Sequence, residues 1–268
     1  MGVDQPPGRI LKLTVCYDGT DLVGWQRQAV GDSVQALLEA ALARFEGAPV
    51  VVHGAGRTDA GVHALGQVAS VRVTFDHDGE TLARGLNAQL PPVVRVLRVD
   101  DAAPEFHARF DARSKRYRYL IRNAALVNPF ERMFVWHVPQ PLDHRAMHAA
   151  AKLLEGTHDF AAFHSVGSDT SGSIRTIRAS DVRRTQPAAA ANVLHVDVSA
   201  ASDLLAYEVR GDGFLRHMVR TIAGTLVEVG RGWREPESMV ELLQSGRREK
   251  AGPTAPPQGL FLVGVDYD

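Results

Sequence analysis

The stretch Gly54-Ala-Gly-Arg-Thr-Asp-Ala-Gly-Val-His63 lies between two segments with strand character, 50–53 and 68–75. Three glycines in its first eight residues let the backbone turn tightly and hold polar side chains at the tip of a loop. The spacing does not fit a dinucleotide-binding loop, which needs G-x-G-x-x-G followed directly by a helix. Asp59 is thus a candidate catalytic carboxylate, although an isolated loop aspartate is more often a turn residue than a nucleophile.

A second segment, Arg113-Ser-Lys-Arg-Tyr-Arg-Tyr-Leu-Ile-Arg122, contains five cations, two tyrosines and no acid. Alternate side chains of a strand face opposite sides of its sheet, which predicts one aromatic and one basic face. The two faces consist of Tyr117, Tyr119 and Ile121, and of Arg116, Arg118 and Arg122. Such a strand suits phosphate neutralisation and base stacking in RNA binding. A core of tyrosines with a solvated basic back explains the same pattern equally well.

A third segment, Arg210-Gly-Asp-Gly-Phe-Leu-Arg-His-Met-Val-Arg220, opens a helix that the apolar periodicity predicts over 214–229. Arg216 and Arg220 are four residues apart, so we expect them on one side of this helix. Exposure to solvent is the usual explanation of such a pair. A functional alternative is that Arg220 pairs with a carboxylate and keeps it ionised.

Strands and helices alternate along the chain, which predicts an α+β fold. Asp32 is the expected N-cap of the first helix, with Gln35 three residues on completing a capping box. We expect two halves, 1–105 and 106–268, with a site in the crevice between them. The strands are expected at 10–17, 50–53, 68–75, 93–99, 114–122, 173–184, 193–199, 204–210 and 260–267. The helices are expected at 34–45, 80–90, 143–155 and 214–229, with a shorter one after residue 236.

Composition limits the class of protein. An apolar content of 45% over 268 residues is that of a chain with a full core, and no segment approaches the ~18 apolar residues of a membrane span. A single cysteine, Cys16, excludes an intramolecular disulfide and a cysteine metal cluster, so we expect a cytoplasmic protein. The net charge of −1 means that any RNA affinity depends on where the cations cluster.

The histidines do not predict a metal site. His144 and His148 have the i, i+4 spacing of a zinc helix but lack its glutamate and a third ligand. His53 and His63 flank the glycine-rich loop, where we expect them to orient or cap it.

These segments, in this order, resemble the tRNA pseudouridine synthase A family. The resemblance runs from near residue 10 to the last strand, and Val93, where the family often has an acid, is one departure from it. Besides 54–63, the matching motifs are Tyr17-Asp-Gly-Thr20, Gly24-Trp-Gln26, Gly66-Gln-Val-Ala69, Leu86-Asn87 with Leu90-Pro91, Phe106-His-Ala-Arg-Phe110, Arg116-Tyr-Arg-Tyr119, Gly156-Thr-His-Asp-Phe160, Ile174-Arg-Thr-Ile177, Gly213-Phe-Leu215 with Met218-Val-Arg220, and Gly259-Leu260.

The resemblance implies the pseudouridine synthase fold, with two α/β halves, mainly antiparallel sheets and a central catalytic cleft. It also implies isomerisation of uridine to pseudouridine at positions 38, 39 and 40 of the tRNA anticodon stem-loop, by a homodimer without metal or organic cofactor. The target base must leave its stack before such chemistry.

The resemblance assigns roles residue by residue. Asp59 matches the nucleophile, Tyr117 the tyrosine that stacks on the target base, Arg57 the arginine that replaces the everted nucleotide, and Arg220 the partner of the nucleophile. Thr58 and Gly56 are further expected substrate contacts. The expected RNA contacts are Arg27, Lys115, Arg116, Arg118, Arg216 and His217.

Two rival functions use the same residues. One is an RNA-binding module without catalysis. Such a module has no use for an acid such as Asp59 beside phosphates. A carboxylate-pair glycosidase needs two facing acids, whereas only Asp59 stands out in a glycine-rich loop. The atom that Asp59 attacks does not follow from the residues.

Overall fold

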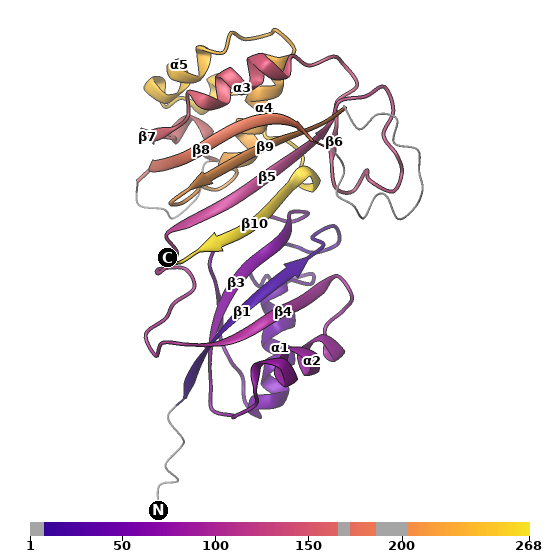
Figure 1. Cartoon of the computed structure of the whole chain (residues 1–268), viewed down its shortest axis with the longest axis vertical. Helices are drawn as coiled ribbons and strands as arrows, with labels where there is room; N and C mark the ends of the chain where they lie inside the picture. The colour runs from indigo at the N-terminus through magenta and orange to yellow at the C-terminus, as the bar shows by residue number, and fades with distance from the viewer. Residues whose placement is uncertain (1–7, 166–171, 186–202) are drawn as a thin grey trace, which may run out of the picture. The chain divides into compact units, whose positions relative to one another are not determined.

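The computed structural model describes residues 8–165, 172–185 and 203–268, which form two compact units (Figure 1). The first unit runs to Arg113 and includes Phe261–Asp268, and the second is Ser114–Leu260. The strand expected at 193–199 lies outside the described residues. No helix in the described part of the chain is long and apolar enough to cross a membrane.

The first unit is a sheet with two helices. Strand β1 (Arg9–Tyr17) pairs antiparallel with β3 (His63–Val73) on one side and with β4 (Val94–Ala102) on the other. The short β2 (Val52–Gly54) pairs antiparallel with β3, and β10 (Leu260–Asp266) pairs parallel with it. Helix α1 (Val34–Glu46) contacts β2, and helix α2 (Gly79–Gln89) contacts β4. The two helices also contact each other. The predicted alternation of β1 buries Leu11, Leu13, Val15 and Tyr17.

In the second unit four strands pair antiparallel in the order β5-β9-β8-β7, and the short β6 pairs parallel with β5. Helices α3, α4 and α5 lie together on one side of this sheet (Figure 1). The strand bounds are β5 Ser114–Arg122, β6 Trp136–His137, β7 Gly156–Asp159, β8 Ile174–Thr185 and β9 Leu204–Gly211. The helix bounds are α3 His144–Lys152, α4 Met218–Gly230 and α5 Ser238–Ser245, with short 3-10 turns at Ala161–Phe163, Arg248–Lys250 and Pro257–Gly259.

The units differ from the expected halves 1–105 and 106–268 in two respects. Residues 106–113 stay with the first unit, where Ala108 N–H donates to Ser70 Oγ and Arg113 N–H donates to Asp266 O. The last strand, β10, also belongs to the first unit, because it pairs with β3. Pairing between segments so far apart in sequence leaves no local signal.

The predicted N-cap of α1 is wrong by one residue. Ser33, which is fully buried, caps α1 by accepting a hydrogen bond from Ala36 N–H, whereas Asp32 is exposed. Gln35 forms no capping box, since its side chain accepts from Arg27 N–H and donates to Val52 O. The glutamine therefore ties α1 to the strand that leads into the glycine-rich loop.

The predicted start of α4 is also wrong. The helix begins at Met218 instead of residue 214, because His217 has a left-handed backbone with φ 63°. Arg216 precedes the helix, so Arg216 and Arg220 do not form the expected pair on one helical side. Apolar Leu215 fits the helical period without belonging to the helix.

Replacing Ser33 with alanine should lower the free energy of unfolding by about 1 kcal/mol, because α1 loses its side-chain cap. Asp32→Ala is the matched control and should change it by less than about 0.5 kcal/mol, as expected for an exposed position. Urea unfolding of both variants checks this. Equal losses would mean that Ser33 is not the cap that matters.

Candidate active site

The loop that carries Asp59 connects β2 with β3 and is tied to the sheet at its start. Ala55 N–H donates to Val68 O at 2.7 Å. Gly54 lies directly against the indole of Trp25, where a Cβ atom would collide with the ring. Beyond this point Arg57 is exposed, Thr58 is buried and Asp59 is half-buried. The loop thus presents a cation and a carboxylate on either side of an anchored residue.

Thr58 is the anchor of this loop. Its Oγ1 lies 2.8 Å from the hydroxyl of Tyr17, which is buried at the end of β1. Its carbonyl oxygen accepts from Trp25 N–H at 3.0 Å. The fully buried Gln67 of β3 donates from Nε2 to Gly56 O at 2.8 Å and lies 3.5 Å from the Tyr17 hydroxyl. Side chains of two neighbouring strands therefore fix the backbone just before Asp59.

The backbone around Asp59 is held from a second direction. Gly24, with φ 100°, passes so close that a Cβ atom there would lie 2.5 Å from Thr58 O and 3.0 Å from the carbonyl carbon of Asp59. Val62 N–H donates to Asp59 O at 3.2 Å, closing a turn. The carboxylate is consequently carried by backbone with little room to move.

The two histidines beside the loop behave differently. His63 is buried, accepts from Gly19 N–H at 3.0 Å and stacks on Phe261 at 4.7 Å, so these contacts join it to the turn after β1 and to β10. His53 is exposed, and its ring lies against that of His107 at a tilted angle. Among the described residues there is no group of three or more side chains placed to hold a metal ion.

In the second unit, β5 has the two faces that the sequence predicts. Tyr117 is buried and meets Phe214 edge to face at 5.0 Å. Tyr119 is fully buried and donates to Pro256 O at 2.7 Å. The opposite face is less free than expected, because Arg122 is buried in a two-pronged ion pair with Glu131.

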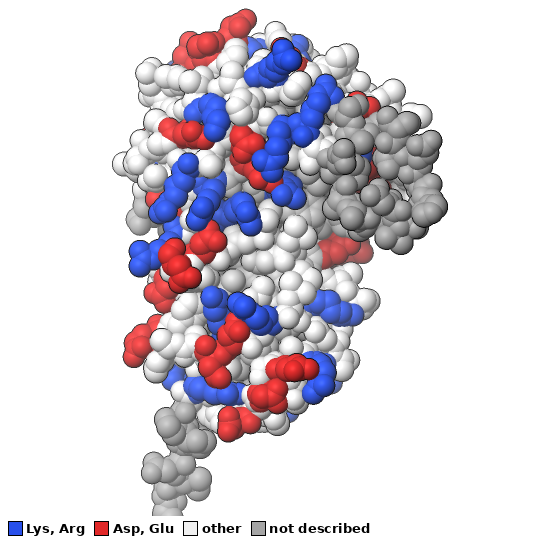
Figure 2. Space-filling view, in the orientation of Figure 1, with Lys and Arg blue, Asp and Glu red and all other residues white. Residues whose placement is uncertain are grey.

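Other cations of this face differ in how much of their charge is available. Arg118 contacts Glu208 at 2.5 Å, and Glu208 also pairs with Arg183 at 2.9 Å. Arg116 is exposed. Lys115, which alternation puts on the face of Tyr117, is half-buried. In the view of Figure 2, basic side chains gather over β5, β9 and β8 with acidic ones between them.

Arg220 lies on α4, which contacts β5. Its Nε donates to Ala255 O at 2.8 Å, and Ala255 N–H donates back to Arg220 O at 3.1 Å. Burial raises the pKa of the Tyr119 hydroxyl, and the positive charge of Arg220 acts in the opposite direction. The guanidinium of Arg220 is thus held near the aromatic face of β5, the face that also carries Tyr117.

The remaining expected RNA contacts lie at the start of α4 and beside α1. Arg216 is exposed, and His217 Nδ1 lies 2.6 Å from Ser165 Oγ. Arg27 is largely exposed and lies 3.4 Å from Glu39. The expected site residues are divided between the two units. The first unit carries Asp59, Arg57, Thr58, Gly56 and Arg27, and the second unit carries the others.

Comparison with known proteins decides the family. A model of the tRNA pseudouridine synthase family matches residues 14–111 and 150–268. The chain belongs to this family. It is 44% identical to tRNA pseudouridine synthase A of Pelobacter propionicus over 97% of this chain and 100% of the relative. It is 45% identical to the protein of the same name from Myxococcus xanthus, over 96% and 91% of the two chains.

The predicted resemblance and the α+β class are thereby confirmed, and the synthase belongs to a family of isomerases. Sequence analysis missed Tyr17, Trp25 and Gln67 as supports of the loop. All three lie in matching motifs, namely Tyr17-Asp-Gly-Thr20, Gly24-Trp-Gln26 and Gly66-Gln-Val-Ala69, which was the available signal. Tyr17 meets Thr58 and Gln67 across 41 and 50 residues of the chain, and Trp25 also meets the loop from a distant segment, so their roles were not readable locally.

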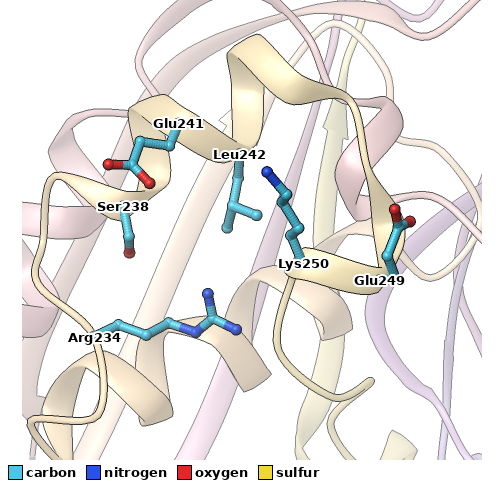
Figure 3. Close-up of a pocket in the computed structure, with 6 residues that line it drawn as sticks. All are labelled: Arg234, Ser238, Glu241, Leu242, Glu249 and Lys250. Atoms are coloured by element: carbon cyan, nitrogen blue, oxygen red, sulfur yellow. The ribbon is translucent and has the colours of Figure 1, made fainter.

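The synthase also has a hollow of about 260 Å³ that is lined by other residues (Figure 3). Arg234 and Lys250 line it together with Glu241 and Glu249, so its charges are balanced. Arg234 is also paired with Glu228 at 2.5 Å. None of the expected site residues lines it, and it is not a candidate active site.

Tyr17→Phe removes the hydroxyl that Thr58 contacts, and should lower kcat roughly tenfold or more, because Asp59 is no longer held in place. The free energy of unfolding should fall by about 1 kcal/mol. Tyr207→Phe is the matched control, since Tyr207 is also a buried tyrosine with a hydroxyl partner, Ser180, but lies in the second unit. It should cost similar stability and leave kcat unchanged. Equal kcat in the two variants would contradict the anchoring role.

The same variant has a pH signature. An unfolded tyrosine ionises near pH 10, whereas burial raises the pKa of Tyr17 to about 12. The native state then binds the proton more tightly, so folding stability falls as pH rises from about 10 to 12. Tyr17→Phe should reduce this alkaline loss, measured by urea unfolding at each pH.

Proposed function

We propose that the chain isomerises uridine to pseudouridine at positions 38, 39 and 40 of the tRNA anticodon stem-loop. The observation that carries the proposal is the anchored loop that holds Asp59 two residues after the exposed Arg57. Family membership supplies the reaction class and tRNA as substrate. The three positions rest on the resemblance to the tRNA pseudouridine synthase A family.

The reaction sets three tasks for the side chains. The bond from C1′ to N1 must break, the uracil must turn while held, and C1′ must bond to C5, which loses its proton. The base must be out of its stack, since its atoms are otherwise inaccessible. An exposed arginine on the catalytic loop is suited to fill the gap, and this is the role that we assign to Arg57.

Asp59, Tyr117 and Arg220 are proposed to act on the same uridine. Asp59 serves as the nucleophile, which must be ionised, and Arg220 favours its ionised form. The Nε–H bond of Arg220 to Ala255 O fixes its guanidinium without neutralising its charge. Tyr117 stacks on the uracil, and its edge-to-face contact with Phe214 sets the plane of its ring.

Thr58 and Gly56 receive supporting roles in this proposal. The Thr58 hydroxyl is occupied by Tyr17, and the Gly56 carbonyl by Gln67. These contacts place Asp59 and Arg57, and Thr58 and Gly56 stay proposed substrate contacts, because a hydroxyl and a carbonyl oxygen can each form a second hydrogen bond.

Backbone phosphates are proposed to meet the basic face of β5 and the residues around the start of α4. Arg116 and Arg118 lie on the face of β5 opposite Tyr117. They are therefore proposed to contact RNA phosphates at some distance from the target base. Lys115, Arg216, His217 and Arg27 are further proposed contacts. An isomerisation consumes no redox equivalent, and we propose that it proceeds in the cytoplasm, in a homodimer, without metal or organic cofactor. A monomeric mass in solution would contradict the dimer.

Asp59→Asn should fold, bind tRNA and form no pseudouridine, because an amide cannot act as the nucleophile. The measurement is release of tritium to water from tRNA labelled at C5 of uridine, which also separates a synthase from an RNA binder or a glycosidase. Asp32→Asn, at an exposed position, is the control and should be fully active. Turnover by Asp59→Asn above a small fraction of wild type would remove Asp59 from this role.

Arg116→Gln should weaken tRNA binding and lower the slope of log Kd against log salt by roughly 0.7 to 0.9, the value of one phosphate contact. Arg118→Gln is its matched partner and should change the slope less, because Glu208 already offsets that charge. Fluorescence anisotropy over a salt series measures both slopes. If neither variant moves the slope, this face of β5 is not the path of the RNA.

A further inference from the structure

Three aromatic rings stack at the surface of the first unit without any part in the site described above. The His53 and His107 rings lie 4.9 Å apart at 35°, and the His107 and Phe110 rings lie 4.3 Å apart at 34°. His53 is exposed, and Phe110 is 74% exposed. We call these three residues the ring stack. Exposed aromatic rings that lie together on a surface are typical of a binding site.

The ring stack is built on a fixed residue. Ala108 is fully buried, its N–H donates to Ser70 Oγ at 3.1 Å, and its carbonyl accepts from the Tyr267 hydroxyl at 2.7 Å. His107 N–H also donates to Asp111 Oδ2 at 2.8 Å. The segment that presents the rings is therefore ordered in advance, which reduces the entropy lost when a ligand binds.

The surroundings of the ring stack are those of a site for a flat, anionic ligand. The exposed Arg109 has its guanidinium carbon 5.6 Å from the centre of the Phe110 ring. A hollow of about 420 Å³ adjoins the rings, and His53, His107, Arg72 and Glu105 are among the residues that line it. Burial lowers the pKa of His107, which keeps its ring neutral at neutral pH. Aromatic rings beside an arginine suit base stacking next to a phosphate.

The ring stack is close to the catalytic loop along the chain. His53 precedes Asp59 by six residues, which span at most about 20 Å. At ~3.4 Å per stacked nucleotide this upper limit corresponds to no more than roughly six nucleotides. A base that meets the rings would hence flank the target uridine in the same RNA.

We propose that the ring stack is a second docking point for the tRNA, where an unpaired base flanking the target stacks on Phe110 and its phosphate meets Arg109. The proposal rests on tRNA being the substrate. It assigns to Phe110, Arg109 and His53 a part in substrate positioning that is separate from the chemistry at Asp59.

The test uses the full-length protein and an unmodified tRNA transcript. Phe110→Ala should weaken tRNA binding about tenfold, in line with the loss of one stacked base. Phe110→Tyr should restore it, because the ring is kept. Phe130→Ala is the matched control, since Phe130 is 75% exposed in the second unit, and should bind like wild type.

The salt dependence separates stacking from charge. Phe110→Ala should leave the slope of log Kd against log salt unchanged, whereas Arg109→Gln should lower it by roughly 0.7 to 0.9. Thermal unfolding should be unaffected by Phe110→Ala, because the side chain is exposed. A tenfold loss of binding by Phe130→Ala as well would show a general effect of surface rings and would overturn the proposal.

Abasic substitution in the RNA identifies the base. Among the nucleotides that flank the target, removal of one base should weaken binding by wild type and leave binding by Phe110→Ala unchanged. If no flanking position shows such coupling, or if Phe110→Ala binds as tightly as wild type, the ring stack is not a docking point. Tritium release by wild type is assayed in parallel, so that a failure of the proposed function is seen separately.

Discussion

The hydrogen bonds that join Tyr17, Thr58 and Gln67 are the constraint on which the site depends. All three side chains are buried, one at the end of β1, one in the loop and one in β3. A buried hydroxyl or amide that loses its partner costs about 1 to 3 kcal/mol, so the loop cannot leave this position without that penalty. The sheet thereby transmits its rigidity to the residue next to Asp59.

Close packing of backbone adds a steric limit to this polar one. Gly24 and Gly54 are the two positions where another segment comes too near for any side chain, the first against Thr58 and the second against Trp25. The loop is consequently fixed by its contacts as well as by its hydrogen bonds. Arg57 is the exposed charged side chain of the loop, whereas Asp59 is half-buried. The loop thereby separates the side chain proposed to meet the RNA from the carboxylate proposed to act on the base.

Local patterns predicted elements well and their ends less well. The alternation of β5 predicted its bounds at both ends, since Tyr117, Tyr119 and Ile121 on one face are all buried. The N-cap of α1 was missed because Asp32 and Ser33 are both good caps, and only Ser33 accepts from the helix. The start of α4 was missed because a left-handed histidine, His217, leaves no trace in hydrophobic periodicity.

The site shows the same division between local and distant information. Asp59 and Arg57 stand out in a short motif, whereas the roles of Tyr17 and Gln67 exist only once distant strands pair. Charge counts mislead in a similar way, because Glu131 and Glu208 hold Arg122 and Arg118 of the basic strand. A protein with net charge −1 and such paired arginines has fewer cations for phosphates than its sequence suggests. Stacking on exposed rings, which needs no net charge, is then a physically sufficient source of further RNA affinity.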